Sequence, residues 1–446
     1  MRGDRRSREP MTAADRRLAL ARDIAAAVAP LLGPHLALKL WDGSTAPANV
    51  GPDQLLVRFS DEGTLAALAK SPKLDTLVRL HALGRIDLEN GDLFDLAERR
   101  PSVRGRDLLR AVGPLRLARG AAAFLKVPAG DLKLPGEGGP NAAPGRSGDP
   151  DDNQKNIAHH YDVSNAFYRL FLDRRLIYSC AYFQDWNDDL DTAQEAKLDL
   201  VCRKLRLKPG ETFLDVGCGW GALVCHAAER YGVTAHGVTL SREQLAGAQA
   251  MIEERGLQGR VTVALADWTT VAGSFDKIAS VGMFEHVGLK NADAYYRGVR
   301  RLLKPGGLYL HHAITRRAKP GDDRKLRPEA KAIMRHVFPG AELDHIGSTL
   351  SGLERAGFEV QDTEALRRHY ARTTALWCRR LQANRAAAEA EVGEVRTRMW
   401  IAYLAGVSLA FARGSIGVCQ TLASSRTKSG SVALPATRGD VYAPGP

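Results

Sequence analysis

The sequence predicts an α/β fold, in which a doubly wound, Rossmann-like sheet follows a smaller N-terminal α+β domain. Between residues 211 and 317, short apolar runs alternate with segments of helical periodicity, which is typical of βαβ units and a mostly parallel sheet. The first apolar run leads into a glycine-rich loop, and the two together cover residues 213–221. A stretch rich in proline and glycine, residues 131–153, separates this region from everything before it and indicates a linker.

The chain has 446 residues, enough for two or three domains, and an ordinary globular composition with 44% hydrophobic and 26% charged residues. Its net charge of +12 predicts an acidic partner: nucleic acid, an anionic membrane surface or an acidic small molecule. Arginine is concentrated at residues 2–8 and 99–119. The six cysteines are scattered without a C-x-x-C pair, which indicates neither a disulfide scaffold nor a zinc site and is typical of a reducing cytoplasm.

Residues 1–130 form the predicted N-terminal α+β module. Helical periodicity covers 12–32 and, with an interruption near Pro72, also 65–83, while strands are expected at 36–41, 54–59 and 85–89. No catalytic constellation is found in this part of the sequence. We therefore expect a module for binding or scaffolding.

The second domain is expected to cover residues 154–425. Its strands are predicted at 212–216, 234–239, 261–265, 277–281 and 307–313, and its helices at 222–231, 242–254 and 295–303.

Three later segments complete the organisation of the chain. A helix is predicted from 396 to about 422, with aromatic and aliphatic residues that can form core. Its apolar part, 399–412, is too short to span a membrane, which takes about 20 residues. The basic segment 315–328 has no assigned role. Residues 426–446 have the composition of a disordered tail.

The glycine-rich loop predicts a cofactor site. Gly217, Gly219 and Gly221 have G-x-G-x-G spacing, which is not the dinucleotide G-x-G-x-x-G, and no Lys-Ser or Lys-Thr follows as in a phosphate-binding loop. Glycine lets backbone N–H groups approach a ligand closely. Asp215, two residues before the first glycine, suits a ligand with an ammonium group. These features favour S-adenosylmethionine over a purely structural turn.

Two further strand ends carry polar residues at the edge where parallel sheets bind ligands. The second strand leads to Thr239, Ser241 and Gln244, whose hydroxyls and amide can hold a ribose, although Ser241 can also simply cap the next helix. The third strand leads to Asp267 and Trp268, which can bind and stack on an adenine; an ordinary loop is the alternative.

The fourth strand ends near Glu285 and His286, an acid and an imidazole at a place where such folds carry out chemistry, although a helix-capping pair looks the same. Before the sheet, His159 and His160 are adjacent, which is poor spacing for two ligands of one metal, so no metal site is predicted. Cys180 lies among polar and aromatic neighbours, and a buried, inert cysteine is the default expectation.

Several motifs occur together in one order: Tyr178-Ser-Cys-Ala-Tyr-Phe183, Asp215-Val-Gly-Cys-Gly-Trp-Gly221, Gly237-Val-Thr-Leu-Ser-x-x-Gln244, Val281-Gly-Met-Phe-Glu-His-Val-Gly288 and His312-Ala-Ile314. With these motifs, roughly residues 154–425 resemble the cyclopropane-fatty-acyl-phospholipid synthase family, which depends on S-adenosylmethionine. The first and fourth motifs are the most specific. The resemblance implies a Rossmann-like methyltransferase sheet.

The resemblance also implies a reaction. S-adenosylmethionine would give its methyl group to a cis double bond in a phospholipid acyl chain, and loss of a proton from that methyl would close a cyclopropane ring. A dry, preorganised site would protect the developing carbocation. In the family the base is thought to be a bound bicarbonate, whose pocket carries over to Cys180, Glu285, His312, Ile314 and Tyr370, with the Cys180 and Ile314 backbone N–H groups in its shell. Tyr178 and Ser179, which begin the first motif, join the cofactor site.

The implied partners are a phospholipid membrane surface and unsaturated acyl chains, and no nucleic acid. The enzyme is expected to be cytoplasmic and peripherally associated with the inner face of the membrane, since its basic excess would hold it on anionic lipid. The N-terminal domain would serve lipid binding or dimerisation, so a homodimer is one expected arrangement.

Two alternatives stay open. The same scaffold can C-methylate the unsaturated chain to a branched or methylated olefinic product, because the same cation forms and the residues named do not separate the outcomes. A non-catalytic membrane-binding or nucleic-acid-binding protein is permitted by the charge. It is opposed by the intact glycine loop together with Cys180, Glu285, His312 and Tyr370.

Overall fold

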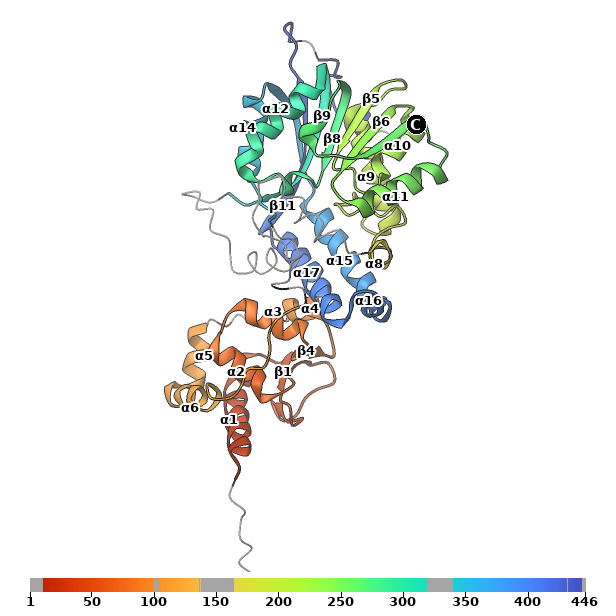
Figure 1. Cartoon of the computed structure of the whole chain (residues 1–446). Coiled ribbons are helices and arrows are strands. Elements are labelled where there is room, and N and C mark those ends of the chain that lie inside the picture. The colour runs from red at the N-terminus through yellow and green to blue at the C-terminus, as the bar shows by residue number, and fades with distance from the viewer. Residues whose placement is uncertain are drawn as a thin grey trace, which may run out of the picture. The chain divides into compact units, whose positions relative to one another are not determined.

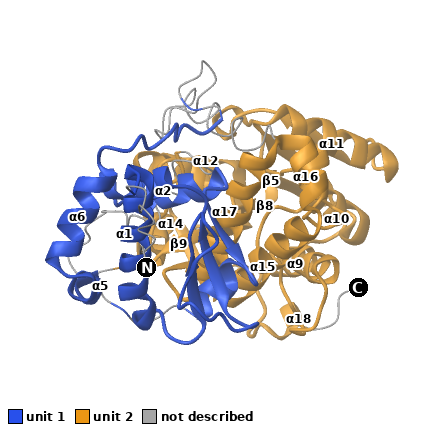
Figure 2. Ribbon diagram, turned by 90° about the horizontal axis from the view of Figure 1, so that it is seen from below, with its two compact units in different colours: residues 1–137 blue, residues 138–446 orange. Residues whose placement is uncertain are grey.

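The computed structural model describes residues 11–99, 103, 105–135, 137, 164–318, 340–430 and 432–442. The chain divides into two compact units, residues 1–137 and 138–446, which Figure 2 shows in blue and orange. The expected linker therefore begins too early: Leu134 is buried, and Glu137 pairs with Arg79 at 2.6 Å, so both belong to the first unit. The predicted linker residues 138–153, His159, His160 and the arginines of residues 2–8 lie outside the described part.

The first unit packs helices against a small mixed sheet in the order β2-β1-β3-β4, with β1 and β3 parallel. Its strands are β1 (Leu36–Lys39), β2 (Thr45–Ala46), β3 (Leu55–Phe59) and β4 (Ile86–Glu89). Its helices are α1 (Ala13–Val28), the 3₁₀ helix η1 (Ala29–Leu31), α2 (Glu62–Lys70), α3 (Leu74–Ala82), α4 (Leu93–Glu98), α5 (Gly105–Val112) and α6 (Pro114–Phe124). The predicted elements are present, and the break near Pro72 separates α2 from α3.

The second unit is built on a seven-stranded sheet in the order β10-β11-β9-β8-β5-β6-β7. The strands are β5 (Thr212–Val216), β6 (Thr234–Thr239), β7 (Val261–Leu265), β8 (Phe275–Val281), β9 (Leu303–Arg316), β10 (Phe358–Ala365) and β11 (Ile416–Ser425). Neighbours from β9 to β7 are parallel, whereas β11 runs antiparallel to both β9 and β10. The predicted doubly wound, mostly parallel sheet is confirmed.

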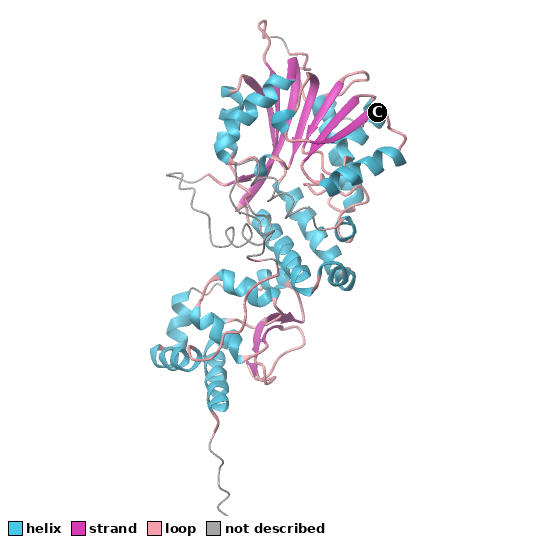
Figure 3. Cartoon of the chain, in the orientation of Figure 1, coloured by secondary structure: helices cyan, strands magenta, loops and turns pink. Residues whose placement is uncertain are grey.

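Helices cover both faces of this sheet (Figure 1, Figure 3). One face packs on α9 (Leu190–Leu205), α10 (Ala222–Tyr231) and α11 (Arg242–Glu254), and the other on α12 (Ala292–Leu302) and α14 (Ile346–Arg355). The remaining helices are α8 (Asn165–Arg169), α15 (Arg367–Ala383), α16 (Arg385–Val392), α17 (Glu394–Ala412) and α18 (Gly439–Tyr442). Short 3₁₀ helices are η2 (Trp268–Thr270), η3 (Phe284–His286) and η4 (Leu289–Asn291).

The side chains of β9 alternate between the two cores, as a strand requires. Leu308 and Leu310 pack with α9 and α10, whereas Tyr309 and Ala313 pack with α12. His312 therefore lies on the α9 face, two residues after Leu310. This alternation places the two adjacent histidines of the strand in different surroundings.

The segment predicted as one helix from 396 to about 422 is in fact a helix followed by a strand. Helix α17 ends at Ala412, and Ile416–Ser425 forms β11 between β9 and β10. β-branched and small residues suit the central strand position that β11 occupies, but local periodicity could not reveal its two partners. None of the described helices is long and apolar enough to cross a membrane.

The expectation of a disordered tail is wrong for its described residues, 426–430 and 432–442. Val432 and Leu434 pack on the core, and Val441 is buried in α18. Arg438 pairs with Asp362, and Asp440 with Arg206 at 2.8 Å. A few apolar residues among many polar ones are enough to anchor a segment, although they leave no periodic pattern. Of the basic segment 315–328, residues 319–328 lie outside the described part.

Candidate active site

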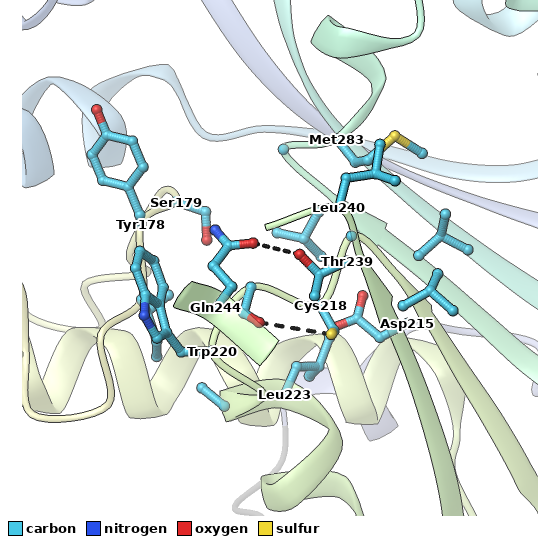
Figure 4. A pocket seen from close by; sticks show the side chains of 18 of the residues that line it. Tyr178, Ser179, Asp215, Cys218, Trp220, Leu223, Thr239, Leu240, Gln244 and Met283 are labelled. Carbon is cyan, nitrogen blue, oxygen red and sulfur yellow. Dashed lines mark hydrogen bonds between the residues drawn. The ribbon is translucent and has the colours of Figure 1, made fainter. Parts of the chain in front are cut away.

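A cavity opens at the carboxyl ends of β5, β6 and β8, and Figure 4 shows most of its lining side chains. This is the edge at which parallel sheets bind ligands. Nine of the eleven residues predicted for the cofactor line it: Tyr178, Ser179, Asp215, Gly217, Gly219, Thr239, Gln244, Asp267 and Trp268. The sequence therefore located this cavity from loops that are far apart along the chain.

The glycine loop forms the floor of the cavity. Gly219 has a φ of +55°, and a Cβ at this position would meet no atom within 4 Å, so its backbone faces open space. Gly221 has another role from the one predicted: it precedes α10 with a φ of +83°, and a Cβ there would lie 3.0 Å from the Cβ of Ala248. It permits close packing of two helices and does not line the cavity.

Asp215 is the buried acid of the cavity, with 2% of its surface exposed. Burial raises the pKa of its carboxyl group to about 7, and the nearby Lys197 ammonium opposes this rise. Its Oδ1 atom has no hydrogen-bond partner among the described residues. A cationic ligand would restore the charge balance and supply the missing donor.

Lys197 is a cavity residue that sequence reasoning missed. It lies on α9, is 3% exposed, and donates from Nζ to Ser179 Oγ at 2.9 Å. Burial lowers the pKa of its ammonium to about 8, against the opposing charges of Asp173 and Asp215. The available signal was its position in the buried stripe Ala193, Lys197, Leu200 and Lys204, where a lysine is out of place.

The residues predicted for the ribose divide into two kinds. Thr239 donates from Oγ1 to Gln244 Oε1 at 2.6 Å, and both line the cavity. Ser241 does not line it. Its hydroxyl caps α11 by accepting from the Gln244 backbone N–H at 3.3 Å, so the helix-cap alternative describes this residue.

The residues predicted for the adenine both line the cavity and both support the local fold. Asp267 accepts from the Thr269 backbone N–H at 2.9 Å, which begins η2. Trp268 packs edge-to-face on Tyr295, with ring centroids 5.1 Å apart. Both residues therefore line the cavity while they support the local fold at this strand end.

Glu285 is an almost fully buried acid next to the cavity. It lies in η3, two residues after the lining residue Met283, and is 1% exposed. Its Oε1 accepts from the Ile314 backbone N–H at 2.6 Å, whereas Oε2 has no partner among the described residues. Burial raises the pKa of the carboxyl group to about 7. The group can therefore change its protonation state near neutral pH.

His312 lies on β9, two residues before Ile314 and on the same face of that strand, whereas the side chain of its neighbour His311 points to the opposite face. His312 Nδ1 lies 3.1 Å from Gln420 Nε2, and its Nε2 has no partner among the described residues. Burial lowers the pKa of His312 well below the usual range, and the Lys197 and Lys204 charges lower it further. His311 instead bonds the Tyr309 hydroxyl at 2.9 Å among the aromatic rings of the opposite face.

One apolar cluster contains Cys180, Ile314 and Tyr370. These are the other three of the five residues that the resemblance implies for the bicarbonate pocket. The Cys180 thiol donates to the Ala181 carbonyl at 3.2 Å, and burial raises its pKa, so it is not a thiolate nucleophile. The expected free Ile314 N–H is not available, because Glu285 accepts from it. Ile314 thus positions Glu285.

Aromatic side chains surround Tyr178. Its ring stacks on Trp377 with centroids 5.0 Å apart and lies 6.3 Å from Trp400. Its hydroxyl donates to Tyr403 at 3.5 Å. Sequence reasoning missed Trp377 because this residue lies about 200 positions from Tyr178 in the chain.

Comparisons with known proteins agree with this geometry. The family model described as mycolic acid cyclopropane synthetase matches residues 149–421. A probable fatty acid methyltransferase of Pseudomonas putida is 38% identical over 410 residues, which cover 91% of this chain and 96% of the relative. Cyclopropane mycolic acid synthase 1 of Mycobacterium tuberculosis is 39% identical over 272 residues, 59% of this chain and 95% of the relative.

Two solved structures match the second unit. The cyclopropane synthase MmaA2 from Mycobacterium tuberculosis has a TM-score of 0.59 and 35% identity, and the match covers 61% of this chain and 98% of that one. The mycolic acid cyclopropane synthase CmaA1, complexed with SAH and CTAB, has a TM-score of 0.58, 38% identity and the same coverage. The resemblance drawn from the motifs is confirmed. This chain belongs to the mycolic acid cyclopropane synthetase family, whose members share the fold of S-adenosylmethionine-dependent methyltransferases.

Proposed function

We propose that this protein transfers a methylene unit from S-adenosylmethionine to the cis double bond of an unsaturated phospholipid acyl chain, forming a cyclopropane fatty acid. The observation that carries the proposal is Glu285: a buried carboxyl group with a pKa raised to about 7 and an unpartnered Oε2 among the described residues, next to a cavity that suits the cofactor. A reaction that removes a proton near neutral pH needs a group of this kind, whereas binding alone does not.

S-adenosylmethionine, when bound, supplies a methyl group on a positively charged sulfur. The chain's own residues fit this cofactor. Asp215 would accept from its ammonium group, Gly219 would approach it with backbone, and Thr239 and Gln244 would hold the ribose hydroxyls. Trp268 offers a flat apolar surface for the adenine.

The alkene would attack the methyl carbon with its π electrons as the bond from that carbon to sulfur breaks and its electron pair stays on sulfur. One carbon–carbon bond would form, S-adenosylhomocysteine would be the leaving group, and a carbocation would remain on the neighbouring carbon. The rings of Tyr178, Trp377 and Trp400 would stabilise that cation through their π faces and exclude water, which would otherwise trap it. Loss of a proton from the added methyl group then leaves the electron pair that closes the ring.

Bicarbonate fits the buried cluster as the acceptor of this proton. Glu285 Oε2 and His312 Nε2 are buried without partners among the described residues, and together they can offer an acceptor and a donor to an oxyanion that carries a hydroxyl group. Bicarbonate, when bound, would supply the base. Glu285 would orient it from one side and His312 from the other.

A phospholipid substrate requires the enzyme to reach a membrane surface, and the first unit has a surface that suits this. Helices α5 and α6 expose Leu109 (57%) and Leu115 (74%), and the basic residues Arg110, Arg119 and Lys126 of the same part of the chain are also exposed. Apolar side chains would enter the lipid while each basic residue near an anionic surface contributes about 1 kcal/mol. We expect flotation with phosphatidylglycerol vesicles but not with phosphatidylcholine vesicles, and Leu115→Ser with Arg119→Glu should abolish it.

A second candidate function is C-methylation of the unsaturated chain without ring closure. The Pseudomonas putida relative, named a probable fatty acid methyltransferase, covers 91% of this chain and must therefore extend into the first unit. The relatives named as mycolic acid synthases match only 59%. In this reaction the same cation would lose a different proton or be reduced by a partner.

Mass spectrometry and proton NMR of phospholipid fatty acids from cells that express the chain would test both candidates. A gain of about 14 mass units with upfield cyclopropyl protons supports ring formation, and the same gain with olefinic or branched-methyl signals supports C-methylation. Cells that express Glu285→Gln provide the matched control. No gain in mass, with soluble wild-type protein present, would overturn both.

A further inference from the structure

Four polar side chains, three of them buried, form a chain of contacts from β10 to β9. Lys204, on α9, donates from Nζ to Glu364 Oε2 at 2.5 Å and to Gln420 Oε1 at 2.8 Å. Gln420, on β11, places its Nε2 atom 3.1 Å from His312 Nδ1. Lys204 and Gln420 are each 1% exposed and His312 is 2% exposed, so water does not compete for these contacts.

The chemistry of these groups allows only one direction of donation. An ammonium group has no lone pair, so Lys204 must meet the carbonyl oxygen of the Gln420 amide. The amide nitrogen then faces His312 and can only donate. His312 Nδ1 must accept, and a neutral imidazole that accepts at Nδ1 carries its proton on Nε2.

We propose that Lys204 and Gln420 are positioning residues that hold His312 in its Nε2–H tautomer, so that the ring presents a hydrogen-bond donor to the reaction cluster. This proposal rests on the proposed function, since it explains how His312 would take its part there. Neither Lys204 nor Gln420 touches the reacting atoms.

The surroundings of His312 agree with a neutral donor. Burial and the nearby charges of Lys197 and Lys204 lower the pKa of His312, so the ring stays neutral at physiological pH. Its Nε2 atom has no partner among the described residues, whereas the partner of Nδ1 is fixed. With Glu285 as acceptor and His312 as donor, the cluster would distinguish the two ends of a bicarbonate ion.

The tautomer can be measured directly by ¹⁵N NMR of protein labelled at histidine, with the His312 signals assigned by their loss in His312→Gln. We expect a pyrrole-type nitrogen at Nε2 and a pyridine-type nitrogen at Nδ1 in the wild-type protein. In Gln420→Glu the two types should exchange, because Lys204 keeps the new carboxylate ionised and a carboxylate can only accept. Turnover of this variant should fall about tenfold or more, with unchanged affinity for S-adenosylmethionine.

Gln361→Glu is the matched control. Gln361 lies on β10 and donates from its amide to Ser424 Oγ at 3.0 Å, and the hydroxyl can donate to a carboxylate in turn. The same chemical change outside the chain of contacts should leave both the His312 tautomer and turnover unchanged.

The outcomes separate this inference from the proposed function. A wild-type Nδ1–H tautomer or a charged imidazolium would overturn the inference, and this measurement needs no substitution in the chain of contacts. The expected tautomer, exchanged in Gln420→Glu without loss of turnover, would support the chain of contacts but remove His312 from the reaction. If Gln420→Glu does not fold, Gln420→Leu serves instead: a mixture of tautomers is expected, and an unchanged single tautomer would overturn the role of Gln420.

Discussion

The two halves of the site each contain a buried carboxyl group, and the two groups differ in their charged neighbours. Asp215 and Glu285 are both almost fully buried, and burial raises the pKa of each to about 7. Asp215 has the Lys197 ammonium nearby, whereas the partner of Glu285 among the described residues is the backbone N–H of Ile314. The Lys197 charge favours the ionised form of Asp215, which suits a positively charged ligand. The pKa of Glu285 is set by burial and backbone hydrogen bonds, so this carboxyl group can gain and lose a proton near neutral pH without a neighbouring cation among the described residues that favours either step.

The strongest test of this comparison is Glu285→Gln. Glutamine keeps the oxygen that accepts from Ile314 but cannot take up or release a proton. Turnover should therefore fall by about 10²- to 10⁴-fold, while affinity for S-adenosylmethionine changes less than about twofold. Release of S-adenosylhomocysteine measures the first and calorimetry the second. Equal losses of both in folded protein would mean that the two halves are not distinct.

The same substitution should stabilise the protein above neutral pH. The folded-state pKa of Glu285 is raised from 4.5 to about 7, so the stability linked to its protonated form is complete below about pH 4.5 and is lost as the pH rises through 7. Glutamine does not ionise, so the free energy of unfolding of Glu285→Gln should exceed that of the wild type by up to about 3 kcal/mol at pH 8. Thermal unfolding of both proteins at pH 5 and pH 8 should show a much larger difference at the higher pH. A difference of the same size at pH 5 would point to packing.

Asp215→Ala should weaken binding of the cofactor without slowing the reaction of the bound cofactor. It removes a charge-assisted hydrogen bond of about 1.5–3 kcal/mol, so affinity for S-adenosylmethionine should weaken by about 10- to 100-fold. Turnover at saturating cofactor should change little. Calorimetry measures the affinity, and an unchanged value would remove Asp215 from the site.

Lys197→Met should have the smallest effect and a characteristic pH dependence. Without the ammonium, the pKa of Asp215 rises further, and less of the carboxylate is ionised at pH 7. At pH 7, affinity for S-adenosylmethionine should fall by a few-fold, which corresponds to a rise of about half a unit or more in the pKa of Asp215. The affinity should recover as the pH is raised, because the carboxyl group is then ionised again. A loss that does not depend on pH would instead assign Lys197 to holding Ser179.

The cofactor half of the site could be predicted because each of its parts is contiguous in sequence. Each of the strands β5, β6 and β7 has cavity-lining residues within a few positions of its end, so Asp215, Thr239 and Trp268 could be placed before any packing was known. Gly221 and Ser241 belong to the same motifs, but their positions are determined by helix packing and helix capping.

The sequence by itself determined the fold class, the family and the cofactor cavity, because strand periodicity, glycine spacing and strand-end motifs are local properties. Only the tertiary structure decided which polar groups are buried and which of them meet. Lys197 and Lys204 face inward from α9, Gln420 reaches His312 from the neighbouring strand, and the alternation of β9 separates His312 from His311. Contacts between residues far apart in the chain, and the pKa values that burial sets, have no local signature.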